Sequence, residues 1–289
     1  MPPVPAIPDL GRRPLVMGVV NMTPDSFSGD GLLNEPDYVT AAVAQAERMV
    51  ADGADILDIG GESTRPGAEP VSAEEEIHRT APVIAAIHAR LPAVPLSIDT
   101  MKPDVATIAL KEGASIINDI SRMKQDLAML RLAASSGAYL VIMHNRTIEG
   151  AVSLTPRIGG EYLAPTYENV VSDVVRDLHA LAERAKNTGV AADRIILDPG
   201  LGFGKTVEQN LLLINEMDKL TSLGYPLLAG PSRKSFIGRV LDSTPEDRLE
   251  GTGTAIAICT LRGASILRVH DVKPMARVVK MVSSIIATS

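Results

Sequence analysis

Short apolar runs alternate with helical patterns along the whole chain. The runs lack a strict alternation of apolar and polar residues, which is typical of strands covered on both faces and therefore of a parallel sheet. Eight runs rich in Val, Ile and Leu predict strands at 15–22, 55–61, 95–99, 115–120, 139–144, 194–199, 226–232 and 266–270. Helical periodicity predicts eight helices, at 37–52, 73–91, 103–112, 126–136, 165–188, 207–223, 246–263 and 273–287.

Capping residues mark the ends of several of these helices. Ser72 and Asp126 stand where an N-cap belongs, and Pro103 and Pro245 suit a first helical turn. A glycine follows six of the helical patterns shortly before the next strand, as a left-handed C-cap does. These glycines are Gly53, Gly113, Gly137, Gly189, Gly224 and Gly263.

Eight strand–helix units predict an α/β fold, a single-domain (β/α)8 TIM barrel, because about 250 residues is the usual size of that fold. The whole chain has 289 residues and no compositional break that would mark two domains. We therefore expect an extended N-terminal arm at 1–14 and a barrel domain at 15–289. An open, doubly wound parallel sheet is the alternative architecture.

Charge and composition exclude several classes of partner. The formal net charge is −7, which gives no electrostatic footprint for a nucleic acid or an anionic membrane. Only 3% of residues are aromatic and none is Trp, so stacking platforms for bases are few. No apolar stretch is long enough to span a bilayer. The single cysteine, Cys259, fits a buried core position and a reducing compartment, and we expect a cytoplasmic protein.

Polar side chains stand at the carboxyl end of every predicted strand. In a (β/α)8 barrel these positions form one ring, at the face where active sites lie. Capping of the following helix could explain any single one of these polar residues. It does not readily explain a polar residue at the end of all eight strands. The ring comprises Asn21, Glu62, Asp99, Asn118, His144, Asp198, Lys234 and His270, with their immediate neighbours.

Two carboxylates in this ring need partners. Asp99 and Asp198 each follow an apolar run, and a buried carboxylate is costly unless it is paired or hydrogen-bonded. A ligand with adjacent N–H groups would satisfy them, with Asn118 serving mixed donor and acceptor edges. A heterocycle with an amidine-like edge fits these groups. A structural ion pair across the barrel mouth is the alternative.

A second group suits an anion. Arg268 and His270 lie two residues apart on the last strand, so their side chains share one face. The loops after strands seven and eight commonly bind phosphate in this fold. Asn21 could supply an oxygen ligand for Mg²⁺. These residues together favour a phosphate ester as substrate.

Two glycine-rich segments do not match nucleotide-binding motifs. The segment GLGFGKT at 200–206 has Pro199 where a Walker A loop needs its first glycine, so we interpret it as a loop carrying Phe203 and Lys205. The segment GTGTA at 251–255 lies inside a helical pattern and lacks the third glycine of a dinucleotide fingerprint. Close helix packing is the simpler reason for its glycines.

Seven motifs in order resemble the dihydropteroate synthase family, pterin-binding TIM-barrel transferases of folate biosynthesis that sulfonamides inhibit. The resemblance extends from about residue 15 to 287. The motifs are GVVNMTPDSFSGDG (18–31), DIGGESTRPGA (58–68), LSIDT (96–100), IINDIS (116–121), ILDPGLGFGKT (196–206), GPSRKSFIG (230–238) and LRVHDV (267–272).

The resemblance implies a reaction and a set of site residues. The reaction joins p-aminobenzoate to 6-hydroxymethyl-7,8-dihydropterin diphosphate with Mg²⁺, in a cytoplasmic homodimer formed through helices near 246–263 and 273–287. Pterin would be held by Asp99, Asn118, Met143, Asp198 and Lys234. Diphosphate would meet Arg268 and His270, and metal would meet Asn21. The p-aminobenzoate site would be shaped by Thr64, Arg65, Pro66, Phe203, Lys234 and Ser235.

Catalysis would rest on Asp99, Lys234, Arg268, His270 and Asp25. Fixed donors and the metal would stabilise the departing diphosphate, after which the arylamine attacks without a general base. The loops after strands one and two, the first of them carrying Asp25, would close over the site and exclude water.

One segment departs from the family pattern. After the fifth strand the family usually has Met-His-Met and then a Gly-Thr-Pro-like turn, whereas this chain reads MHNRTIEGAVSLTP at 143–156. Because Asn145 and Arg146 replace the usual residues, the resemblance does not say how this loop lines the pterin site. Two alternative functions remain. A corrinoid-linked pterin methyltransferase would need neither the SRKSF segment nor the Arg268 and His270 pair, and a non-catalytic pterin-binding subunit would lack loop or diphosphate residues that this chain has.

Overall fold

The structure is a computed structural model, and it describes residues 4–23, 32–33, 37–63, 68–121, 126–148, 151–155, 158–162 and 166–288. Its strands are β1 (Leu15–Asn21), β2 (Ile56–Gly60), β3 (Leu96–Asp99), β4 (Ile116–Asp119), β5 (Tyr139–Met143), β6 (Val152–Thr155), β7 (Gly159–Tyr162), β8 (Ile195–Asp198), β9 (Leu228–Ala229) and β10 (Ile266–Val269). Its α-helices are α1 (Tyr38–Ala51), α2 (Ala73–Arg90), α3 (Pro103–Lys111), α4 (Leu127–Ser136), α5 (Val170–Asn187), α6 (Val207–Asn215), α7 (Asp218–Thr221), α8 (Ser235–Leu241), α9 (Leu249–Leu261) and α10 (Val272–Ile286).

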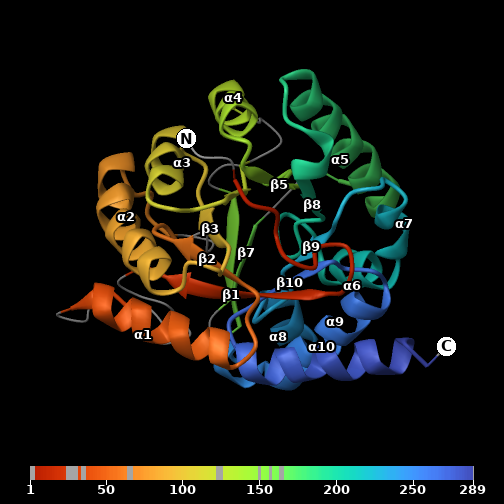
Figure 1. Cartoon of the computed structure of the whole chain (residues 1–289). Coiled ribbons are helices and arrows are strands. Elements are labelled where there is room, and N and C mark those ends of the chain that lie inside the picture. The colour runs from red at the N-terminus through yellow and green to blue at the C-terminus, as the bar shows by residue number, and fades with distance from the viewer. Residues whose placement is uncertain are drawn as a thin grey trace.

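Eight parallel strands form the barrel, in the order β8-β5-β4-β3-β2-β1-β10-β9. The two ends of this sheet meet through a parallel bridge between Leu197 and Leu227, which closes the ring. Helices surround the strands on the outside (Figure 1). The predicted (β/α)8 fold is confirmed, and the open-sheet alternative is wrong.

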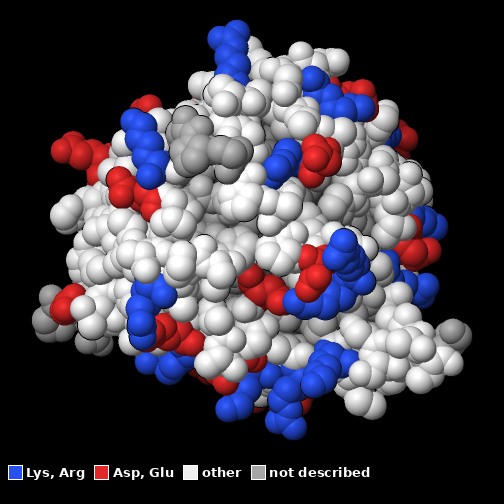
Figure 2. Space-filling model, in the orientation of Figure 1, with Lys and Arg blue, Asp and Glu red and all other residues white. Residues whose placement is uncertain are grey.

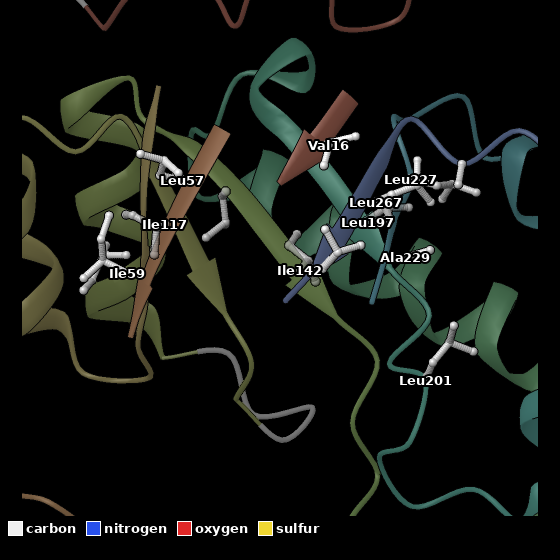
Figure 3. Packing of buried hydrophobic residues seen from close by; sticks show 14 of the residues in the cluster. Val16, Leu57, Ile59, Ile117, Ile142, Leu197, Leu201, Leu227, Ala229 and Leu267 are labelled. Carbon is white, nitrogen blue, oxygen red and sulfur yellow. The ribbon is translucent and has the colours of Figure 1, made fainter. Parts of the chain in front are cut away.

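The two faces of the strands build two separate apolar cores. Outward residues such as Val16, Leu57 and Leu267 pack against the helices (Figure 3). Inward residues near the amino ends, among them Met17 and Ile196, fill the lower half of the barrel. Because side chains alternate along a strand, the next inward layer toward the carboxyl ends belongs to the residues two positions further on. That layer is polar, and it forms the site described below.

Helix boundaries follow the predicted caps. The side chains of Ser72 and Asp126 accept hydrogen bonds from the backbone N–H groups of Glu75 and Ala128. All six predicted C-cap glycines have positive φ, between 70° at Gly137 and 114° at Gly113. A left-handed residue is easiest for glycine, which explains its recurrence there.

Five features differ from the predicted pattern. An antiparallel hairpin, β6 and β7, follows β5, and α5 begins at Val170 after its N-cap Asn169 rather than at 165. The predicted helix at 207–223 is two helices, α6 and α7. A short helix, α8, follows the seventh barrel strand, and Pro245 begins a 3-10 turn before α9 rather than α9 itself.

The residues before β1 lie against the amino end of the barrel. Ile7 is buried among the inward residues of the lower barrel layer. Its backbone N–H donates to the Tyr139 hydroxyl at 3.3 Å, and Arg194 donates to the carbonyls of Val4 and Pro5. These contacts cap the end of the barrel opposite the candidate site.

Charged side chains of both signs are interspersed over the visible surface (Figure 2). Along α8, α9 and α10 the surface also carries large exposed apolar side chains, namely Val240, Leu241, Leu249, Leu261, Met281, Ile285 and Ile286. Among the described helices, none is both long enough and apolar enough to cross a membrane.

Candidate active site

The carboxyl ends of the strands bring the predicted pterin residues into one pocket. Register pairs Asp99 of β3 with Asn118 of β4, while Asp198 ends β8 and Arg268 lies in β10. The pocket has about 370 Å3 of space, part of it open to solvent. It is lined by Asp99, Asn118, Ile120, Met143, Asp198, Leu201, Phe203, Gly230, Lys234 and Arg268.

Arg268 spans the barrel mouth between two carboxylates. Its Nε donates to Asp58 Oδ2 at 2.6 Å, and its Nη2 donates to Asp99 Oδ2 at 2.8 Å. Asn118 Nδ2 also donates to Asp58 Oδ2, at 3.2 Å. A structural ion pair across the barrel mouth, predicted as the alternative partner for the buried carboxylates, is therefore found at Asp99. Asp58, which is fully buried, was missed by the sequence reasoning because it lies inside an apolar run.

Burial shifts the acid–base properties of this pocket. It raises the pKa of Asp99 to about 7, although Arg268 opposes the shift. It also raises the pKa of Asp198 to about 6, opposed by a hydrogen bond from the Gly200 N–H. For Arg268 burial acts to lower the pKa, but Asp58 and Asp99 outweigh it and the pKa is raised. Arg268 therefore stays charged, while Asp99 is divided between two protonation states near neutral pH.

Three oxygens in and beside the pocket have acceptor capacity without a hydrogen-bond partner among the described residues. They are Oδ1 of Asp58, Oδ1 of Asp99 and Oδ1 of Asn118. Buried polar atoms are normally satisfied, and leaving one unpaired costs about 1–3 kcal/mol. The pocket therefore suits a ligand that presents several N–H donors.

The glycine-rich segment after β8 folds back on itself. Gly200 has φ of +67°, and a Cβ there would lie 2.0 Å from the His144 carbonyl oxygen. Lys205 is buried, and its ammonium donates to the carbonyls of Gly200 at 2.9 Å, Phe203 at 3.0 Å and His144 at 3.4 Å. Burial lowers the pKa of Lys205 to about 7, with Asp198 opposing. Lys205 thus fastens the segment to β5.

Phe203 and Lys234 line the pocket and contact each other. The Lys234 ammonium lies 4.1 Å from the centre of the Phe203 ring, a cation–π contact. Phe203 also packs with Ile120 and Met143 in a small apolar cluster. The predicted role of Phe203 as a wall agrees with this position.

The segment around Lys234 is held by the end of β10. The hydroxyl of Ser232 lies 3.0 Å from His270 Nδ1 and accepts from the His270 backbone N–H at 3.2 Å. Arg233 binds both carboxylate oxygens of Asp271, at 2.9 and 2.7 Å. Ser235 is the first residue of α8. Arg233, like Lys205, thus binds partners within the protein.

The residues after β5 form a second buried network. His144 is fully buried, and its Nε2 lies 3.2 Å from Asp177, which also accepts from Arg146 at 2.7 Å. Burial lowers the pKa of His144 to about 4, so the ring is neutral at pH 7. Asn145 donates to the Ile120 carbonyl at 3.1 Å. The unusual residues after β5 therefore brace the loop behind the pocket.

The remaining predicted residues divide into two groups. Asn21 ends β1 and is partly exposed, and its register partner is Gly60 of β2. The other four, Asp25, Thr64, Arg65 and Pro66, lie outside the described residues. Of the glycines of 251–255, Gly251 has the packing role predicted for it, since a Cβ there would clash with Ile237, whereas a Cβ at Gly253 would meet nothing nearer than 3.6 Å.

The fold and the pocket together define a pterin-binding barrel enzyme. A family model described as pterin binding enzyme matches residues 17–270, and the chain belongs to this family. A dihydropteroate synthase of Bacillus subtilis (strain 168) is 45% identical over 275 residues, covering 95% of this chain and 90% of that protein.

Solved structures agree with this assignment. A dihydropteroate synthase crystallised in the presence of pteroic acid, from Clostridium difficile, has a TM-score of 0.84 at 39% identity, covering 96% of this chain and 98% of the other. The Xanthomonas albilineans synthase with 4-aminobenzoic acid gives 0.83 at 39%, covering 96% and 97%. The Yersinia pestis synthase with a sulfonamide drug complex gives 0.84 at 38%, covering 95% of both chains. The chain is thus a transferase of the dihydropteroate synthase type, acting in folate biosynthesis.

Proposed function

We propose that the pocket holds 6-hydroxymethyl-7,8-dihydropterin diphosphate by its pterin ring and transfers the pterin methylene to p-aminobenzoate. The observation that carries this proposal is the set of unpaired acceptor oxygens at Asp99 and Asn118 on neighbouring strands. A pterin presents adjacent ring N–H and amino donors along one edge. Asp198, across the pocket from β3, supplies a further carboxylate, and Met143 contributes apolar lining.

The p-aminobenzoate half of the site lies toward Lys234. The aromatic ring of p-aminobenzoate would pack beside Phe203. Lys234 and Ser235 would either bind its carboxylate or orient it toward the pterin. Thr64, Arg65 and Pro66 complete this proposal from the loop after β2. Sulfonamides, which share the aniline ring and an anionic group, would compete at the same place.

The diphosphate would lie between β1 and β10. Arg268 and His270 provide a cation and an imidazole at that rim. Mg²⁺ prefers oxygen ligands and takes only a few of them from the protein. The side-chain amide oxygen of Asn21, at the end of β1, would hold it together with the diphosphate. Among the described residues, no cluster of three His, Cys, Asp or Glu could hold a metal. When bound, Mg²⁺ neutralises charge that develops on the leaving group.

The chain's own residues act mainly by position and charge. As the bond from the pterin methylene to oxygen breaks, positive charge develops on the pterin and negative charge on the diphosphate. Asp99 and Asp198, which line the pocket, would then stand beside the ring that becomes cationic, and Arg268 would meet the departing anion. The neutral arylamine then attacks the methylene and loses a proton. Asp25, in the loop after β1, would help to close the site against water.

The direct test incubates the purified protein with the pterin diphosphate, p-aminobenzoate and Mg²⁺, and follows diphosphate and 7,8-dihydropteroate. We expect equal amounts of both products. An Asp198→Asn variant should lose affinity for the pterin diphosphate, while Asp193→Asn, a surface change in the turn before β8, should not. Release of diphosphate without coupled product, or unchanged pterin affinity in the Asp198 variant, would overturn the assignment.

We propose further that the protein works as a homodimer in the cytoplasm. The exposed apolar side chains of α9 and α10, including Leu261, Met281 and Ile285, support a partner surface there, and the surface over the carboxyl end of α10 is uncharged in Figure 2. The fold has a single, buried cysteine and so depends on no disulfide within the chain, which supports a reducing compartment.

A further inference from the structure

A buried arginine lies outside the pocket but beside the segment that carries Lys234. Arg248 immediately precedes α9 and is 2% exposed, one of the largest fully buried side chains among the described residues. Its Nη1 donates to the Arg233 carbonyl at 2.8 Å. Its Nη2 donates to the Ile158 carbonyl at 2.6 Å and to the Ser243 carbonyl at 3.0 Å. One guanidinium therefore joins three separate segments.

The partners of Arg248 are unusual for a buried cation. Within the described part of the chain its hydrogen bonds all end on backbone carbonyls, and its Nε has no partner. Burial lowers the pKa of Arg248, with Glu246 opposing, yet arginine remains protonated in proteins. A buried charge costs free energy unless it is well hydrogen-bonded. The fork geometry of arginine suits three carbonyls, whereas lysine offers a single point charge.

The carbonyl that Arg248 holds belongs to a strained residue. Arg233 has φ of +57°, a left-handed conformation that non-glycine residues adopt rarely and that persists only where the surroundings fix it. The Arg233 N–H donates to Thr252 Oγ1 at 3.2 Å, and its side chain binds Asp271. Lys234, at the cation–π contact with Phe203, is the next residue in the chain. The position of Lys234 thus depends on how Arg233 is held.

We propose that Arg248 is a positioning residue for the p-aminobenzoate half of the reaction. Its guanidinium fixes the strained Arg233 peptide, so that Lys234 and Ser235 face the pocket, and it couples this segment to the β6–β7 hairpin through the Ile158 carbonyl. The inference rests on the proposed roles of Lys234 and Ser235. The pterin contacts at Asp99, Asn118 and Asp198 come from barrel strands that Arg248 does not touch, so they should stay in place.

Two variants test the inference by different routes. Arg248→Lys keeps the charge but loses the fork. Gly238→Ala keeps Arg248 and displaces its guanidinium, because a Cβ at Gly238 would lie 2.2 Å from Nη2. Arg262→Lys, at the other end of α9 and partly exposed, is the matched control. For both test variants we expect kcat/KM for p-aminobenzoate to fall about 10- to 100-fold, the usual effect of misplacing a binding group.

A second measurement separates positioning from loss of fold. Lys234 is also among the predicted pterin ligands, but Asp99, Asn118 and Asp198 keep their positions in both test variants. The calorimetric affinity for a pterin analogue without p-aminobenzoate should therefore fall at least about threefold less than kcat/KM for p-aminobenzoate does. Equal losses for both substrates, or unchanged kinetics in Gly238→Ala, would overturn the inference. Lys234→Met tests the proposed function on which the inference rests. If that variant leaves the KM for p-aminobenzoate unchanged, the proposed role of Lys234 fails, and the result does not bear on how Arg248 holds the segment.

Discussion

Removing the charge of Arg268 should destabilise the protein even without substrate. In Arg268→Met the buried Asp58 carboxylate loses its partner at 2.6 Å, and Asp99 loses its partner at 2.8 Å. Asp58 is fully buried and the Arg268 side chain is only 20% exposed, so solvent screens the pair little. Breaking a buried pair on one side costs about 3–5 kcal/mol. At about 2–4 °C for each kcal/mol in a large domain, the Tm should fall by about 6–20 °C.

A compensating change should restore much of that loss. The double variant Asp58→Asn with Arg268→Met removes the charge on the more deeply buried of the two carboxylates that the single variant strands. Asp99 can take up a proton, because burial raises its pKa to about 7, so little uncompensated charge remains. Calorimetry of the substrate-free proteins measures both effects. Arg13→Met is the control, because Arg13 is 49% exposed where it binds Asp55 and an exposed pair is worth about 0–1 kcal/mol. A fall no larger than in that control would refute a buried pair at the barrel mouth.

Further predictions concern the other charged groups and the partner surface. Because burial raises the folded-state pKa of Asp99 to about 7, the folded chain binds this proton more tightly than the unfolded chain does. Stability from this group is therefore present below about pH 4 and lost as the pH rises through 7; Asp99→Asn should flatten that slope in urea titrations, and parallel slopes would contradict the assignment. Lys205→Met should release Phe203 from its fastened loop and raise the KM for p-aminobenzoate about tenfold or more, and steady-state kinetics with an unchanged KM would count against it. Met281→Glu should shift the protein toward monomer in sedimentation experiments, and an unshifted dimer would place the interface elsewhere.

Local signals in the sequence predicted the barrel well. Each apolar run became a barrel strand, because a strand covered on both faces needs little beyond continuous apolar residues. The six cap glycines show positive φ because the turn after a helix demands that conformation wherever the chain is placed. The hairpin of β6 and β7 gave too short a signal: its strands have four residues each, β7 carries no apolar alternation, and their contacts with Arg239 and Arg248 come from far along the chain.

Long-range pairing explains what sequence reasoning missed in the site. Asp58 lies in the middle of an apolar run, and its partner Arg268 is 210 positions away, so only strand register brings them together. The only feature of the sequence that could have indicated a functional role for Asp58 was a charged residue inside an apolar run. The internal partners of Lys205 and Arg233 were equally out of reach, because the sequence gives the charge of a side chain and not its direction. Gly200 with φ of +67° turns the loop so that Lys205 meets its own backbone.

The unpaired oxygens explain why this acidic chain should favour a donor-rich heterocycle over a simple anion. Asp58, Asp99 and Asn118 each keep one buried oxygen without a partner in the described structure, while Arg268 already donates to both carboxylates. Each oxygen left unpaired costs about 1–3 kcal/mol, and a pterin edge that donates to it regains that free energy on binding. An analogue with acceptors in place of those donors would leave the cost in place and add repulsion. On the proposed function, the selectivity of the pocket would thus reside in acceptors fixed by strand register, and the cations Arg268 and Lys234 would act on the substrate's charge as the diphosphate leaves.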